Sequence, residues 1–140
     1  MSTSAPSSGP SYPRHPGQIS QGELYWCEPD PQDTVGSELA KDRPWVIVSI
    51  PQLHRGNCVV GLPLSTQIDK ACAHLIQIPK EEIHLDGAVS VDCVALTDQI
   101  RALDKRRLRR KAGRISIRAI NGVMLGLDYL FGKEPLPRKN

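Results

Sequence analysis

The sequence predicts a small, mainly β fold of the α+β class, in which a strongly bent antiparallel sheet or small barrel carries one C-terminal helix. Short β-type runs separated by turn residues fill the chain between residues 23 and 103, and the hydrophobic period becomes helical after residue 116. Many short strands followed by one amphipathic helix favour a curled sheet with the helix packed against it. A length of 140 residues fits one domain with one core.

The strands are expected at six places. Pro63 lies inside one of them and predicts a bulge or an edge position, because proline cannot donate a ladder hydrogen bond. Turn signals at Gly56-Asn57 and Asp86-Gly87 separate neighbouring runs. The six runs are Glu23–Glu28, Pro44–Ile50, Cys58–Leu64, Ala73–Ile78, Ser90–Leu96 and Ile100–Leu103.

The C-terminal helix is expected to begin after a Ser116 cap and to end at Gly132. Its apolar positions recur at offsets that trace one face of a 3.6-residue period. They are Ile120, Val123, Met124, Leu127, Leu130 and Phe131.

Composition divides the chain into one domain and two tails. Residues 1–20 are rich in Ser, Pro and Gly, which predicts a disordered N-terminal tail. The domain is expected over residues 21–132, followed by a polar C-terminal tail at 133–140. No signal-peptide pattern is visible, and no apolar run approaches the roughly 20 residues that span a bilayer. A cytoplasmic location without a membrane partner is therefore expected.

Positive charge is concentrated in one segment. Residues 101–118 hold nine basic residues and one acid, so this segment carries +8 and the remainder −5, for a net charge of +3. We expect a short basic helix here, capped by Asp104, running to Lys111 and stopped by Gly113. Either a polyanionic partner or a solvated helix face accounts for such a run.

The cysteines and histidines give weak signals. Cys27, Cys58, Cys72 and Cys93 form no CxxC pair and no zinc-like spacing, so no metal and no cofactor are expected. Buried, reduced thiols are the simplest interpretation. The histidines at 54 and 84 lie in segments of loop character, whereas His74 lies in an alternating run and could face either side of it.

Polar groups gather where three of the expected strands begin or end. A long polar loop, residues 30–42, leads into Arg43 at the start of one strand. Ser65, Thr66 and Gln67 follow another strand, and residues 97–101 follow a third. Forked donors, hydroxyls and amides together suit a phosphodiester, since they match phosphate oxygens, sugars and base edges.

These segments resemble the MazF/PemK toxin family. The matching pieces, in chain order, are Gly22–Trp26, Val35–Glu38, Arg43–Val48, Pro63–Ile68 and Asp98–Leu108. Each piece alone is weak, but their order and spacing are specific. The resemblance implies an SH3-like (CcdB/PemK-type) antiparallel barrel with a C-terminal helix. It also implies a homodimeric type II toxin that cuts single-stranded mRNA without a metal and is neutralised by an acidic antitoxin.

The resemblance further implies roles for individual residues. The family's catalytic arginine falls on Arg43 and its partner, usually a threonine, on Ser65. In such toxins the ribose 2′-hydroxyl attacks the neighbouring phosphate, leaving a 2′,3′-cyclic phosphate and a 5′-hydroxyl. The positions expected to bind RNA are Ser37, Glu38, Thr66, Gln67, Asp98, Gln99 and Arg101.

Chemistry restricts these roles but leaves two questions open. Arginine stays protonated, so Arg43 suits transition-state stabilisation or acid catalysis, and either Glu38 or Asp98 could be the general base. Leu96 stands where one branch of the family has an arginine, so that branch's arginine–aspartate mechanism does not transfer. A non-catalytic toxin of the same fold, such as a gyrase-binding inhibitor or an RNA- or antitoxin-binding module, is the alternative.

Overall fold

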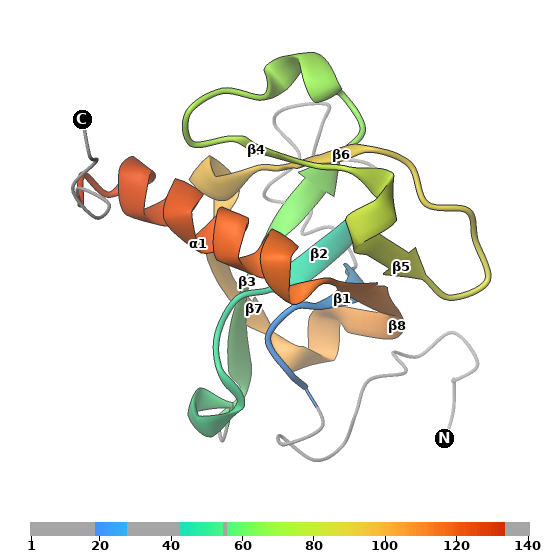
Figure 1. Cartoon of the computed structure of the whole chain (residues 1–140). Helices are drawn as coiled ribbons and strands as arrows, with labels where there is room; N and C mark the ends of the chain where they lie inside the picture. The colour runs from blue at the N-terminus through green and yellow to red at the C-terminus, as the bar shows by residue number, and fades with distance from the viewer. Residues whose placement is uncertain (1–18, 28–42, 55, 134–140) are drawn as a thin grey trace, which may run out of the picture.

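A curled antiparallel sheet with one helix against it forms the body of the protein. Figure 1 shows the computed structural model, which describes residues 19–27, 43–54 and 56–133. The sheet has eight strands in the order β4-β6-β3-β2-β1-β8-β5, and β7 also pairs with β3. The strands are β1 (Glu23–Cys27), β2 (Pro44–Ile47), β3 (Cys58–Ser65), β4 (Ile76–Ile78), β5 (Ile83–Leu85), β6 (Cys93–Ala95), β7 (Arg101–Asp104) and β8 (Leu108–Ile115).

Strand β3 makes the bend because it changes partner along its length. Its first half pairs with β7 up to Gly61, and its last two residues, Leu64 and Ser65, pair with β6. Pro63 lies between these two ladders, and its carbonyl accepts a hydrogen bond from the Leu96 N–H at 3.0 Å. The position that predicted a bulge or an edge is thus a switch between partners, where the missing proline N–H is least costly.

Two apolar clusters fill the two faces of β2 and β3. Val46 and Leu62 pack beneath the helix, whereas Trp45 and Ile47 belong to a second cluster on the other face. This alternation follows from the two-residue period of a strand. The sheet therefore has a core on each side, and its strands are apolar on both faces.

The C-terminal helix, α1 (Ile117–Leu130), confirms the periodicity of the sequence. The Ser116 hydroxyl caps it by accepting the Ala119 N–H at 3.0 Å. Val123 and Leu127 are buried against the sheet, but Phe131 is 71% exposed, so its assignment to the buried face is wrong. Phe131 lies just past the helix, where the chain turns away at Gly132 (φ +79°).

The basic segment is not the expected helix. Only Lys105–Arg107 forms a 3₁₀ turn, capped by Asp104 as expected, and the chain continues as β8. Pairing with β1 on one side and β5 on the other decides this, because tertiary partners override local helix propensity. Gly113 does not stop a helix; it lies within β8, where a Cβ would lie 1.8 Å from the His84 carbonyl oxygen.

A bulge in β8 exposes consecutive basic side chains. Tyr25 pairs with Lys111 and Cys27 with Leu108, so three steps on β8 face two on β1. An extra residue of this kind breaks the in–out alternation. Arg109, Arg110 and Lys111 are consequently all exposed; the ammonium of the last lies 3.0 Å from the Glu23 carboxylate.

The remaining strands differ from the sequence expectation mainly in length. Strand β2 ends at Ile47, β4 begins only at Ile76, and β6 covers Cys93–Ala95 alone. Strand β5 was not among the expected strands, because its sequence is weakly patterned. It forms by antiparallel pairing with β8. Short ladders in a tightly curled sheet end where neighbouring backbones diverge.

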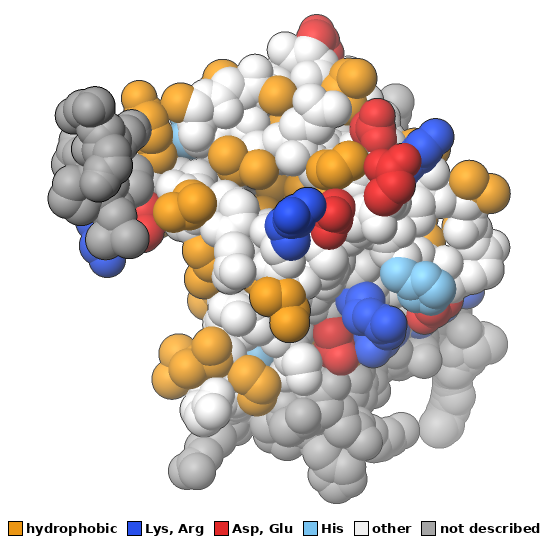
Figure 2. Space-filling model, viewed as in Figure 1, with side chains coloured by type: hydrophobic (Ala, Val, Ile, Leu, Met, Phe, Trp, Pro, Cys, Tyr) orange, Lys and Arg blue, Asp and Glu red, His pale blue; other side chains and the backbone are white. Residues whose placement is uncertain are grey.

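The surface has two further features. Figure 2 shows hydrophobic side chains along α1, and the exposed ones include Ile117, Leu125 and Tyr129. Cys27 and Cys93 are buried as expected, but Cys58 and Cys72 are exposed, so burial of all four thiols is wrong. Within the described residues, no helix has the length and apolar character needed to cross a membrane.

Candidate functional site

Arg43 lies at the entrance to β2. Its side chain is partly buried, and its Nε has no hydrogen-bond partner among the described residues although water does not reach it. Burial lowers the pKa of the guanidinium from its usual value, and arginine nevertheless stays charged at neutral pH. A buried, unsatisfied donor on a cation is costly, on the order of 1–3 kcal/mol. An anionic ligand would relieve that cost, so Arg43 is suited to bind a phosphate.

Ser65 ends β3 and shapes the turn that follows it. Only 4% of the residue is exposed, and its Oγ accepts the Gln67 N–H at 3.1 Å. This leaves the hydroxyl hydrogen available for donation. Thr66 and Gln67, which follow in the turn, are both exposed.

The strand register brings Arg43 and Ser65 to the same place. Strands β2 and β3 pair Ile47 with Gly61 and Trp45 with Pro63. The ladder ends at Trp45 and Pro63: Arg43, which precedes β2, and Ser65, which ends β3, each lie two residues beyond this last pair. Directly opposed residues in an antiparallel pair project from the same face of the sheet. Arg43 and Ser65 therefore lie at the same end of the ladder, and continuation of its register would set them opposite each other.

The third group of candidate residues follows β6. Thr97 is fully buried and its hydroxyl donates to the His74 carbonyl, which ties this turn to the chain before β4. Asp98 is exposed, whereas Gln99 is half-buried. Arg101 pairs with Gly61, four residues along β3 from Ser65, or about 13 Å at strand rise. Ser65, Thr66 and Gln67 are contiguous, but Arg101 lies well apart from them.

Two of the expected RNA-binding residues, Ser37 and Glu38, lie outside the described residues. Among the described residues, no group of three or more His, Cys, Asp or Glu side chains is placed to hold a metal ion. Sequence reasoning also missed the structural role of Thr97. A threonine directly after the apolar run was the available signal, since such hydroxyls commonly satisfy backbone groups where a strand ends.

Comparison with known proteins identifies the family. A model of the family described as "PemK-like, MazF-like toxin of type II toxin-antitoxin system" matches residues 20–131. The chain belongs to this toxin family. The match spans the whole folded region, including the Arg43 and Ser65 segments, and it confirms the resemblance found in the sequence.

Solved structures share the fold of this MazF-like chain. An "Endoribonuclease from Mycobacterial species" is 19% identical with a TM-score of 0.63, covering 91% of this chain and 98% of that one. An "Endoribonuclease in complex with its cognate antitoxin from Mycobacterial species" is 21% identical, with TM-score 0.61 and coverage of 84% and 98%. A MazE-MazF structure from Deinococcus radiodurans is 20% identical, with TM-score 0.59 and coverage of 89% and 99%. The mainly β barrel-like fold with a C-terminal helix is thereby confirmed.

Proposed function

We propose that this MazF-like toxin is a metal-independent, sequence-specific endoribonuclease that cleaves single-stranded mRNA and so inhibits translation and growth. The observation that carries the proposal is that Arg43 and Ser65 each lie two residues beyond the same end of the β2–β3 ladder. Family membership and the names of the structural relatives support it. In this proposal a single scissile phosphate lies between the guanidinium and the hydroxyl.

The proposed reaction is an internal transfer at phosphorus. The ribose 2′-oxygen forms a bond to phosphorus while the bond to the 5′-oxygen breaks, leaving a 2′,3′-cyclic phosphate and a 5′-hydroxyl. The 2′-proton goes to a general base, and the leaving oxygen gains a proton. Arg43 donates hydrogen bonds to the phosphorane oxygens and lowers the barrier electrostatically. Ser65 donates its remaining hydroxyl hydrogen to a non-bridging oxygen.

The other candidate residues have supporting roles in this proposal. The exposed side chains of Thr66 and Gln67 are next to Ser65 and suit contacts with sugar and base edges. Arg101, which begins β7 opposite Gly61 of β3, suits a flanking phosphate. Ser37, Glu38, Asp98 and Gln99 complete the proposed RNA-binding set, with Glu38 or Asp98 as general base.

We further propose that the toxin works in the cytoplasm as a homodimer held in check by a cognate acidic antitoxin. One structural relative was solved with its cognate antitoxin, and others are MazE-MazF structures. The +8 segment, residues 101–118, runs from β7 through the 3₁₀ turn and β8 into the start of α1 and gives such a partner a favourable field, which speeds association more than it raises affinity.

One observation favours a second candidate function, a non-catalytic toxin or a binding module for RNA or antitoxin. Ser65 is almost fully buried, and its oxygen already accepts the Gln67 N–H. A serine used only to hold a turn would look the same. Under this alternative the fold and its partners are kept and the chemistry is lost.

Cleavage in the presence of EDTA separates the two functions. A long RNA incubated with the protein is expected to give discrete cuts with cyclic phosphate and 5′-hydroxyl ends. Arg43→Ala should reduce the rate by about 100- to 1,000-fold, the usual cost of losing a transition-state donor. Arg118→Ala, which removes an exposed arginine from the first turn of α1, is the matched control and should cut normally. Cutting that persists in Arg43→Ala, or that requires added metal, would contradict the proposed mechanism.

A further inference from the structure

Gln77 lies in the same cross-strand row as Ser65. Val94 in β6 pairs with Ser65 on one side and with Gln77 in β4 on the other. Because directly opposed residues share a face, the Ser65, Val94 and Gln77 side chains project from the same face of the sheet. The neighbours of Gln77 confirm the alternation, since Ile76 and Ile78 pack into the core beneath α1.

The side chain of Gln77 is open to a ligand. The residue is exposed, and its amide makes no hydrogen bond to the described part of the chain. Strand β4 ends the sheet order, so no described strand covers the outer side of Gln77. Ser65 and Val94 of this row are buried, whereas Gln77 at its outer end is exposed. Gln77 is therefore placed to contact a molecule that lies across the strands.

The spacing of the row sets what Gln77 can reach. Two interstrand steps separate it from Ser65, which amounts to about 9–10 Å. At that distance the two side chains cannot hold the same phosphate. Gln77 can instead reach an adjoining nucleotide of an RNA chain that lies across the β-strands. A carboxamide offers one donor and one acceptor side by side, the pattern that pairs with a base edge such as that of adenine.

We propose that Gln77 is a specificity-determining residue, which reads the base of a nucleotide adjoining the phosphate held at Ser65. The inference rests on the proposed ribonuclease function and adds to it a source of sequence selection. Unpaired bases are read in this way, by hydrogen bonds to their exposed edges. Gln77 takes no part in the bond-breaking step.

The test is to map cleavage sites in a pool of RNA with randomised sequence, using the full-length protein. Wild type is expected to show a base preference of at least about fivefold at one position close to the cut, as one bidentate contact supplies. Gln77→Ala should abolish the preference at that position alone, while preferences elsewhere remain. Gln52→Ala, an exposed glutamine in the 3₁₀ turn Pro51–Leu53 beyond the other end of β3, is the matched control. An unchanged cleavage profile in Gln77→Ala would overturn the proposal and leave the ribonuclease function standing.

A binding measurement keeps the proposal independent of catalysis. Short RNAs that carry a 2′-deoxy sugar at the cut site cannot react, and they can differ in one base at a time. Fluorescence anisotropy should show base-dependent affinity for wild type and its loss in Gln77→Ala, even if no cleavage occurs. If wild type binds all these RNAs equally, Gln77 does not read a base, whatever the result of the cleavage assay.

Discussion

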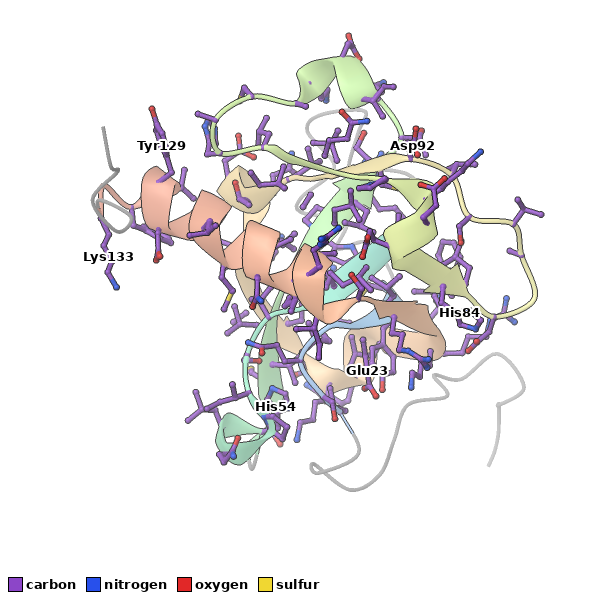
Figure 3. The ribbon with its side chains drawn as sticks, viewed as in Figure 1. Glu23, His54, His84, Asp92, Tyr129 and Lys133 are labelled. Atoms are coloured by element: carbon purple, nitrogen blue, oxygen red, sulfur yellow. The ribbon has the colours of Figure 1, made fainter. Side chains whose placement is uncertain are left out.

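The imidazole of His54 accepts a hydrogen bond from the Ser49 hydroxyl across 2.6 Å, and its Nδ1 lies 2.9 Å from the Ile19 carbonyl oxygen. Figure 3 labels His54 in the turn that precedes β3. A carbonyl only accepts, so the proton is on Nδ1 and Nε2 is the acceptor. Ser49 in turn accepts the Val60 N–H, and the His54 carbonyl accepts from Lys105. This fully buried histidine, expected to be a loop residue, joins the start of the domain to β3 and to the 3₁₀ turn that follows β7.

His54→Ala should therefore destabilise the fold strongly. It leaves a cavity and removes the partners of the partly buried Ser49 hydroxyl and the buried Ile19 carbonyl, a loss of about 2–4 kcal/mol in the free energy of unfolding. Urea denaturation measures it. Gln52→Ala, two residues earlier and exposed, should change stability by less than about 0.5 kcal/mol. Equal stability of the two variants would show that the His54 hydrogen bonds are not structural.

Gly113→Ala should be among the most damaging single-methyl changes in the chain. The added Cβ would lie 1.8 Å from the His84 carbonyl oxygen, and the backbone has φ +151°, so β5 and β8 must separate. We expect a loss of more than about 3 kcal/mol or failure to fold. Gly56→Ala is the control, because nothing lies within 4 Å of its Cβ. Thermal unfolding of both variants tests this prediction. A wild-type Tm for Gly113→Ala would contradict the close approach of β5 to Gly113.

Acid should remove the contribution of Asp104 to stability. Hydrogen bonds from the Arg106 side chain and then from its backbone N–H lower the pKa of Asp104 to about 2. A depressed pKa stabilises the fold above the unfolded value, near 3.9, and the contribution is lost as pH falls towards 2. Asp104→Asn should therefore show a smaller drop in stability between pH 5 and pH 2 than wild type. The pair is exposed, so the difference is small, and identical acid profiles for the two proteins would contradict it.

The four thiols should react in two groups. Cys58 and Cys72 are exposed, whereas burial raises the pKa of Cys27 to about 12 and that of Cys93 to about 11. Because the thiolate is the nucleophile, iodoacetamide at pH 8 should label the exposed pair in the folded protein and spare the buried pair. Peptide mass spectrometry with and without urea tests this. Fast labelling of Cys27 without denaturant would show that β1 is not packed as described.

Local pattern was enough to predict the class of fold. The short β-type runs that become β1, β2 and β3 and the 3.6-residue period of α1 are short-range signals, and both were confirmed because these elements bury their apolar residues. The Ser116 cap is equally local. The family resemblance rested on the order of short motifs and was also readable without coordinates.

Long-range pairing decided the rest. The stretch from Arg109 to Lys111 reads as helix, yet becomes a bulged strand, since β1 and β5 offer hydrogen bonds that no local pattern reveals. Likewise, the sequence pointed to Arg43 and Ser65 separately, but only the pairing of β2 with β3 brought them to the same end of one ladder. The residues of a strand determine which of its side chains share a face, whereas the neighbouring strand and its register determine which residues lie opposite them. A slip of one residue between β2 and β3 would therefore have changed which side chains share a face at the end of this ladder.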